Sequence, residues 1–281
     1  MYFLISLGAI ITSAILFCEN NNIVVSRVKI NKKVKNPIKI VQLSDLHSKE
    51  FGKDNKKLLN KVLNENPDLI LLTGDIIDCT SIRHKEIINF ISKMSEKIPT
   101  YYIPGNHETR AEKYKEIIKK LRKNNVNVLL NEIRTINING NKVNILGLVE
   151  EQGSSEAYIK RAKGEFEYKD YSIIFNEFCK LPGIKIVLSH YPENFKAIGD
   201  KSYYKYKFDL MFSGHAHGGQ FRMPLIGGLY APAQGIFPKY TAGIHKGIKN
   251  NLIISRGLGN SGFPLRLFNK PEIVVVTIEN I

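Results

Sequence analysis

Short apolar runs that end in polar turns recur along this chain of 281 residues. The run at 69–72 (LILL) has no polar side chain and leads directly into the turn at 73–75, as in a parallel strand buried on both faces. Comparable runs lie at 38–43 and 100–103, and segments of helical spacing lie at 53–66, 84–94 and 112–124. Alternating strands and helices predict an α/β fold with its functional loops at the carboxyl ends of the strands.

The second half of the chain is richer in strand-like runs, several of them separated by short turns. With an early run at 22–30, these runs lie at 126–130, 133–138, 142–149, 184–190, 208–214, 251–257 and 272–278. We find no internal repeat and no linker that marks a boundary after about residue 22. The sequence therefore predicts one mixed α/β domain at 23–281, with two sheets and helices on the outside.

Five of the seven histidines follow an apolar run, and carboxylate or amide side chains accompany them. The motifs are D-x-H (Asp45, His47), G-D-x-x-D (Asp75, Asp78), G-N-H-E (Asn106, His107), a lone His190 and G-H-x-H (His215, His217). One such histidine is explained as a hydrogen-bonded core residue, but this set favours a common site. Imidazole, carboxylate and amide groups are ligands that Zn, Mn and Fe accept. The set exceeds the needs of one ion, whereas two ions sharing a carboxylate would use it fully.

These five motifs, in this order, resemble the calcineurin-like metallophosphoesterase superfamily over residues 38–220. The stretches at 227–232 (GGLYAP) and 257–273 are similar to its membrane-anchored bacterial branch. The resemblance implies a four-layer αββα sandwich of two mixed β-sheets flanked by helices. It also implies hydrolysis of phosphoester or pyrophosphate bonds, and we expect a phosphodiesterase that acts on a membrane-associated or lipid-linked substrate.

The same resemblance implies two divalent metal ions, with Mn, Zn and Fe all acceptable. One ion would be held by Asp45, His47, Asp75 and His217, and the other by Asp75, Asn106, His190 and His215, so that Asp75 bridges them. His107 would donate a proton to the leaving oxygen, steadied by Asp78. Glu108 is expected to be solvated or to stand behind the ligands rather than to act as an acid itself.

Three further residues are candidates for contact with the substrate. Arg83 and His84 lie shortly after the second metal motif, although a solvated helix start is the alternative for His84. Arg266 lies in the tail that resembles the bacterial branch, and a structural role is its alternative.

The first segment, residues 2–18, carries no charged side chain. At about 1.5 Å per residue it lies near the short limit for crossing a bilayer. A buried core helix and a cleaved signal peptide are the alternatives, but no Lys or Arg precedes the run and no small-residue cleavage site ends it. We therefore predict that residues 1–22 form an uncleaved single-pass anchor in the cell membrane. The sequence does not decide on which side of the membrane the domain lies, since large domains translocate regardless of flanking charge.

The balance of 41 Lys+Arg against 26 Asp+Glu gives a formal charge of +15 and favours anionic partners. We expect a phosphorylated substrate, with a lipid-linked phosphate suggested by the predicted anchor. The lysines are scattered, which argues against nucleic acid, and nothing indicates an obligate protein partner. Two alternative functions are a non-catalytic metal-binding scaffold of the same fold and a nuclease.

Overall fold

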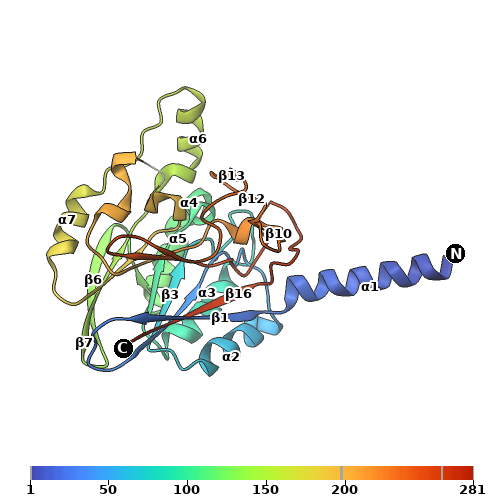
Figure 1. The fold of residues 1–281 in the computed structure, drawn as a ribbon, viewed down its shortest axis with the longest axis horizontal. Coiled ribbons are helices and arrows are strands. Elements are labelled where there is room, and N and C mark those ends of the chain that lie inside the picture. Colours follow the sequence, from blue (N-terminus) through green and yellow to red (C-terminus); the bar gives the residue numbers. More distant parts are fainter. Residues whose placement is uncertain (1, 197–198, 261, 281) are drawn as a thin grey trace.

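Two six-stranded sheets form the centre of the computed structural model, which describes residues 2–196, 199–260 and 262–280 (Figure 1). The first sheet has the order β1-β16-β2-β3-β4-β5, with bounds β1 Val24–Asn31, β16 Glu272–Glu279, β2 Ile38–Leu43, β3 Leu69–Thr73, β4 Thr100–Ile103 and β5 Asn127–Val128. Strands β2 to β5 are parallel, and β16 pairs antiparallel with β2. The first sheet is therefore mixed, with a parallel centre.

The second sheet has the order β14-β15-β9-β8-β7-β6. Its bounds are β14 Gly243–Lys246, β15 Asn251–Ile254, β9 Leu210–Ser213, β8 Ile184–Leu188, β7 Asn141–Gly147 and β6 Glu132–Ile138. The four central strands are parallel, and the two edge strands pair antiparallel with their neighbours. Parallel strands aim their carboxyl ends the same way, so their loops gather at one edge.

The alternation of side chains along each strand divides the core into layers. In β3, Leu69 and Leu71 pack between the two sheets, whereas Ile70 and Leu72 pack toward the helices. Helices α2 (Lys56–Asn64), α3 (His84–Ser95) and α5 (Tyr114–Lys123) cover the first sheet, and α7 (Ser172–Lys180) packs against the second. The predicted αββα arrangement of two mixed sheets is confirmed.

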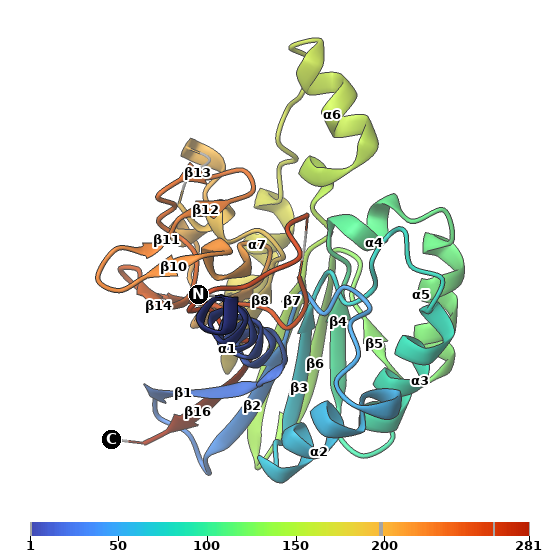
Figure 2. The ribbon, with the colours of Figure 1, turned by 90° about the vertical axis from the view of Figure 1, so that its right-hand side faces the viewer.

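Several elements were not expected from the sequence. They are α4 (Asn106–Arg110), α6 (Ser155–Ala162), α7, the edge strand β14 and four two-residue strands: β10 (Arg222–Met223), β11 (Gly227–Gly228), β12 (Tyr230–Ala231) and β13 (Gly235–Ile236). Strands β10–β11 and β12–β13 form two small antiparallel ribbons. Figure 2 shows these ribbons on one side of the loop-bearing end, with α4 on the other side and α6 projecting beyond both.

The predicted membrane anchor is wrong, and with it the predicted location in the cell membrane. Residues Tyr2–Asn21 do form a helix, α1, which projects from the sheets (Figure 1). However, within the described part of the chain, no helix has the length and apolar character needed to span a membrane. The uncharged run at 2–18 would extend about 26 Å as a helix, short of a hydrocarbon core of about 30 Å.

The last turn of α1 is polar and is tied to the rest of the protein. The Asn20 side chain donates to the carbonyl of Arg266 at 3.3 Å and accepts from the Arg266 backbone N–H at 2.9 Å. The Lys49 ammonium donates to the Asn20 carbonyl at 2.5 Å. These contacts fasten the C-terminal end of α1, beyond the uncharged run at 2–18, to Lys49 and Arg266. The domain limits proposed from the sequence, 1–22 and 23–281, stay a prediction.

Candidate metal centre

The loops that follow β2, β3, β4, β8 and β9 carry all seven predicted metal ligands, and the structure brings them to one edge where the two sheets meet. Five of the seven have left-handed backbone, with φ of 51° at Asp45, 47° at His47, 53° at Asp75, 66° at His215 and 48° at His217. Non-glycine residues adopt this region rarely, at a cost of about 1–2 kcal/mol each. Such clustered strain marks a functional site that the surrounding fold holds in place.

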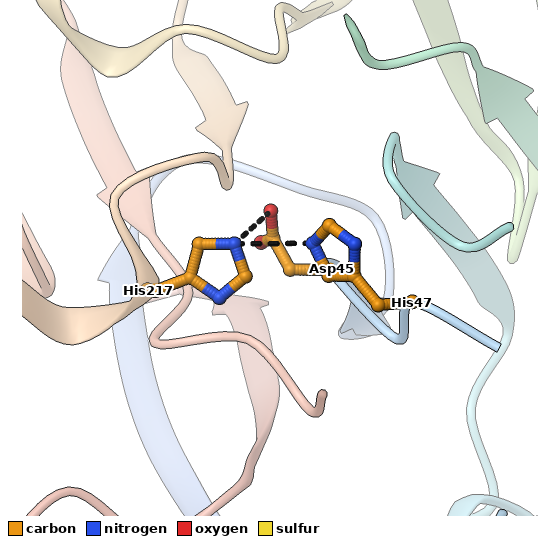
Figure 3. Close-up of side chains that lie close together, drawn as sticks. All are labelled: Asp45, His47 and His217. Atoms are coloured by element: carbon orange, nitrogen blue, oxygen red, sulfur yellow. Dashed lines mark hydrogen bonds and ion pairs between the residues drawn. The ribbon is translucent and has the colours of Figure 1, made fainter. Parts of the chain in front are cut away.

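The first ligand group consists of Asp45, His47 and His217, all buried (Figure 3). His217 Nε2 lies 3.1 Å from His47 Nε2 and 3.6 Å from Asp45 Oδ1. Figure 3 shows the three side chains converging on one small volume, Asp45 and His47 from the loop after β2 and His217 from the loop after β9. Two imidazole nitrogens about 3.1 Å apart match two ligands of a single ion with bonds of about 2.0–2.1 Å.

The second group consists of Asp75, His190 and His215, also buried. His190 Nε2 lies 3.3 Å from Asp75 Oδ2 and 3.2 Å from Asn106 Oδ1. The predicted amide ligand, Asn106, therefore adjoins this group. A carboxylate, an amide oxygen and two imidazoles are a donor set suited to a borderline divalent ion.

One carboxylate oxygen of Asp75 faces both ligand groups. Asp75 Oδ2 lies 3.3 Å from His190 Nε2 and 3.7 Å from His47 Nε2. The other oxygen, Oδ1, accepts the backbone N–H of His107 at 2.8 Å, which fixes the carboxylate plane. Asp75 Oδ2 thus lies between the two ligand groups.

Hydrogen bonds set the tautomers of two imidazoles so that a nitrogen lone pair faces the centre. His190 Nδ1 lies 2.8 Å from the carbonyl of Thr73, which can only accept, so Nδ1 carries a proton. In the neutral ring, Nε2 then keeps its lone pair for a metal ion. His47 Nδ1 lies 3.3 Å from Asp78 Oδ2, which fixes its ring in the same sense. Partners of this kind orient metal-binding histidines and raise their basicity.

Burial and charge set the protonation of the other groups. Burial lowers the pKa of both His215 and His217 well below the usual value, so these rings are neutral and able to bind a cation. Burial also opposes the charging of His190, but the carboxylate of Asp75 outweighs it and raises the pKa of His190 to about 10. Reciprocally, His190 holds the pKa of Asp75 well below its usual value although burial raises it. Without a metal, the site therefore holds a protonated His190.

The residues fit a pair of divalent cations. Asp45 Oδ2 is buried and has no hydrogen-bond partner among the described residues, and burial raises the pKa of this carboxyl. An orphaned carboxylate oxygen beside the neutral imidazole of His217 is costly unless a cation compensates it. Such ions would supply a Lewis acid for the phosphoryl oxygens and a water of lowered pKa.

His107 and Asp78 lie beside the ligands. His107 Nδ1 is 3.1 Å from Asp78 Oδ2, and the His107 side chain is 19% exposed. The same oxygen of Asp78 contacts His47, so one carboxylate orients both rings. Burial lowers the pKa of His107, while the charges of Asp75 and Asp78 act to raise it. A partly open imidazole held by a carboxylate has the geometry of a general acid at the edge of the site.

Of the two expectations for Glu108, solvated or behind the ligands, the structure agrees with the second, because Glu108 is buried. Its carboxylate accepts backbone N–H groups of Asp75 at 2.9 Å, Ile76 at 2.7 Å, Ile77 at 2.9 Å and Gly105 at 2.9 Å. Burial raises the pKa of Glu108 to about 7, against the pull of these donors. Glu108 thus ties the loop after β3 to the loop after β4 behind the ligands.

Glu150 was missed by the sequence analysis. It is buried, and it accepts from the backbone N–H of His190 at 2.9 Å, from Ser189 Oγ at 2.7 Å, from Asn194 Nδ2 at 2.5 Å and from the Tyr203 hydroxyl at 3.1 Å. Burial raises its pKa. The signal was its place directly after the predicted strand at 142–149, at the same edge as the ligands.

Gly74 shows how closely the loops approach each other. Its φ is +90°, and a Cβ at this position would lie 2.6 Å from His190 Nδ1 and 2.7 Å from the backbone nitrogen of Gly105. Neither space nor backbone angle admits a side chain, which explains the glycine before Asp75.

The three predicted substrate contacts are placed differently. Arg83 pairs with Glu50 at 2.8 Å, and His84 is the first residue of α3. Arg266 is 1% exposed and lies near Asp45, with its guanidinium donating to the carbonyls of Gly259 and Arg256. Its contacts hold the C-terminal loop in place. A substrate role for these three side chains stays a prediction.

Comparison with known proteins agrees with this geometry. A family model described as calcineurin-like phosphoesterase matches residues 38–219. The Bacillus subtilis protein YkuE, named as an uncharacterized metallophosphoesterase, is 30% identical over 249 residues, covering 86% of this chain and 79% of that protein. The Escherichia coli protein named phosphodiesterase YaeI is 28% identical, covering 86% and 82% of the two chains.

The fold is also similar to a solved structure of GAP50, described as the anchor in the inner membrane complex of Plasmodium. The TM-score is 0.51 at 12% sequence identity, over 86% of this chain and 81% of that one. At this identity the likeness concerns the fold alone.

Proposed function

Because the chain belongs to the calcineurin-like phosphoesterase family and is a metal-dependent phosphoester hydrolase, we propose that it cleaves phosphodiesters at a centre of two divalent ions. Asp45, His47, Asp75 and His217 would hold one ion, and Asp75, Asn106, His190 and His215 would hold the other. The observation that carries this proposal is the shared position of Asp75 Oδ2 between the two groups.

The protein's own groups have separate roles in the proposed reaction. The ligand loops hold both donor groups on rigid strand ends, so a phosphate bound there is oriented without further ordering. His107 donates its proton to the departing ester oxygen, and Asp78 orients its ring and favours the protonated form. Glu108 and Glu150 keep the ligand loops in register from behind.

Two observations support a diester rather than a monoester. The Escherichia coli relative is named a phosphodiesterase. In addition, Arg83 and Arg266, the two arginines suggested as phosphate contacts, are engaged by Glu50 and by backbone carbonyls. A singly charged diester needs less compensating charge than a doubly charged monoester. The lipid-linked substrate was suggested by the predicted anchor, and because that anchor is wrong, it no longer supports such a substrate.

The test is a comparison of substrates with Mn, Zn or Fe added to metal-free protein. We expect bis(p-nitrophenyl) phosphate to be hydrolysed faster than p-nitrophenyl phosphate, and Asp75→Asn and His107→Ala to lose most of that activity. Equal rates for wild type and both variants would support the scaffold alternative instead. A plasmid DNA arm tests the nuclease, whose cleavage should weaken steeply with salt.

A further inference from the structure

A cavity of about 420 Å³ opens directly beside the metal centre. One wall is His217, whose Nε2 faces His47 and Asp45 in the first ligand group. The remaining wall is formed by Gln220, Phe221, Tyr230, Pro232, Gly262 and Phe263. The cavity therefore adjoins the site, because the His217 side chain belongs to both.

The cavity wall beyond His217 is largely apolar and, among the described residues, has no charged side chain. The rings of Phe221 and Phe263 meet edge to face, with centroids 5.0 Å apart. Tyr230 and Phe263 are 55% and 46% exposed, so apolar surface lies open to solvent where it costs free energy. The one amide in the wall, Gln220, turns its Nε2 to the carbonyl of Phe263 at 2.8 Å. This bond joins the two sides of the cavity.

The wall is built on a fixed frame. Asn269 Nδ2 donates to the carbonyl of His217 at 2.8 Å and to that of Gln220 at 3.0 Å. The backbone N–H of Leu229 donates to the carbonyl of Gly219 at 3.1 Å, which fastens the segment to the small ribbons β10–β13. In Figure 2 these ribbons lie together at the loop-bearing end. A preformed apolar cavity is typical of a ligand site.

We infer that this cavity binds an apolar ester group of the substrate, so that the enzyme selects phosphodiesters with an alkyl or aryl substituent. The inference rests on the proposed function, because the phosphate of that substrate lies at the metal centre. The placement follows from His217, which belongs both to the first ligand group and to the cavity wall, so that an ester group of a phosphate held at the centre can extend into the cavity. Phe221, Tyr230 and Phe263 then determine specificity by contact with the substituent.

The test uses three diesters with one leaving group: p-nitrophenyl methyl, p-nitrophenyl octyl and p-nitrophenyl phenyl phosphate. The leaving-group chemistry is constant, so differences in kcat/KM report binding of the second ester group. We expect the octyl or the phenyl ester to exceed the methyl ester by at least about tenfold, since each buried methylene contributes substantially to binding. Which of the two is preferred tells whether an alkyl chain or an aromatic ring is the natural occupant.

Two variants of exposed wall residues, Tyr230→Ser and Phe263→Ser, should bring that ratio to within about threefold of one. Phe237→Ser is the matched control, because Phe237 is 66% exposed directly after β13 and is no part of the cavity wall. It should keep the wild-type ratio. Equal kcat/KM for all three esters in wild type, or a preference that survives in both variants, would overturn the inference.

Failure of the proposed function gives a different result, namely no hydrolysis of any of the three esters with any metal. The cavity is then tested by titration calorimetry of octyl phosphate against methyl phosphate. We expect tighter binding of octyl phosphate to wild type and loss of that difference in Phe263→Ser. Equal affinities would again overturn the inference.

Discussion

Asp75 and His190 come from different sheets and face each other, with Asp75 Oδ2 3.3 Å from His190 Nε2. Asp75 follows β3 of the first sheet and His190 follows β8 of the second. The two residues are 115 positions apart in the sequence, and the packing of the sheets brings them into contact. The candidate metal centre thus depends on the packing of the two sheets against each other.

Replacement of Asp75 by Asn should remove the ligand shared by both ions. We expect loss of at least one of two bound ions and a fall in kcat/KM of at least about 10³-fold, because both metals contribute to charge stabilisation. Metal content by mass spectrometry of the purified protein and phosphodiester kinetics check this. Asp54→Asn, at an exposed position with φ of 54°, is the control and should keep both ions. Wild-type metal content in Asp75→Asn would contradict the bridging role.

Metal binding should tighten as pH rises. In the metal-free protein, Asp75 raises the pKa of His190 to about 10, so a cation must displace a proton at neutral pH. Affinity for Mn should therefore increase between pH 6 and pH 9, and calorimetry in buffers of different ionisation enthalpy should show proton release. Bound Mn should also raise the Tm, by an amount equivalent to about 2.7 kcal/mol at 100 times Kd. Affinity that is constant over this range would show that His190 is already neutral.

His107 and Asp78 should act as a pair. We expect His107→Ala to lower kcat by about 10² to 10⁴-fold, the usual contribution of a general acid. His245→Ala, a substitution on β14, is the control.

Asp78→Asn tests the same pair through pH. The Asp78 carboxylate raises the pKa of His107, so its removal lowers that pKa, and the acid loses its proton at lower pH. The basic limb of the pH–rate profile should move to lower pH in this variant. An unshifted basic limb would mean that another group donates the proton.

Glu150→Gln should weaken the hydrogen bonds that position His190, although Glu150 is not one of the proposed metal ligands. The carboxylate accepts from the His190 backbone N–H and from three side chains, whereas an amide must turn its own N–H₂ toward at least one of these donors. We expect metal affinity to fall by about 10 to 100-fold, as for other partners that orient ligands. Glu151→Gln, at the exposed neighbouring position, should bind metal as wild type does. An identical loss in both variants would point to the loop rather than to the carboxylate.

Much of the fold was predictable because its signals are local. The buried strand at 69–73 is apolar up to its last residue, Thr73, and helices such as the one at 84–95 show regular spacing of apolar side chains. Helix α6 was missed because its sequence is short and polar, and the ribbons β10–β13 are too short for any periodicity. The anchor prediction failed because the uncharged run at 2–18 was interpreted as sufficient to cross a bilayer, whereas no helix among the described residues, α1 included, has the required length and apolar character.

The order and chemistry of the donor residues were determined by the sequence alone, because strand ends followed by Asp, His and Asn are visible without any tertiary contact. The tertiary structure decided which donors share a site. His47 and His217 meet over a separation of 170 residues, and Glu150 reaches the loop of His190 over 40. Such contacts depend on how two sheets pack, and that packing is set by the summed burial of many side chains rather than by any one motif.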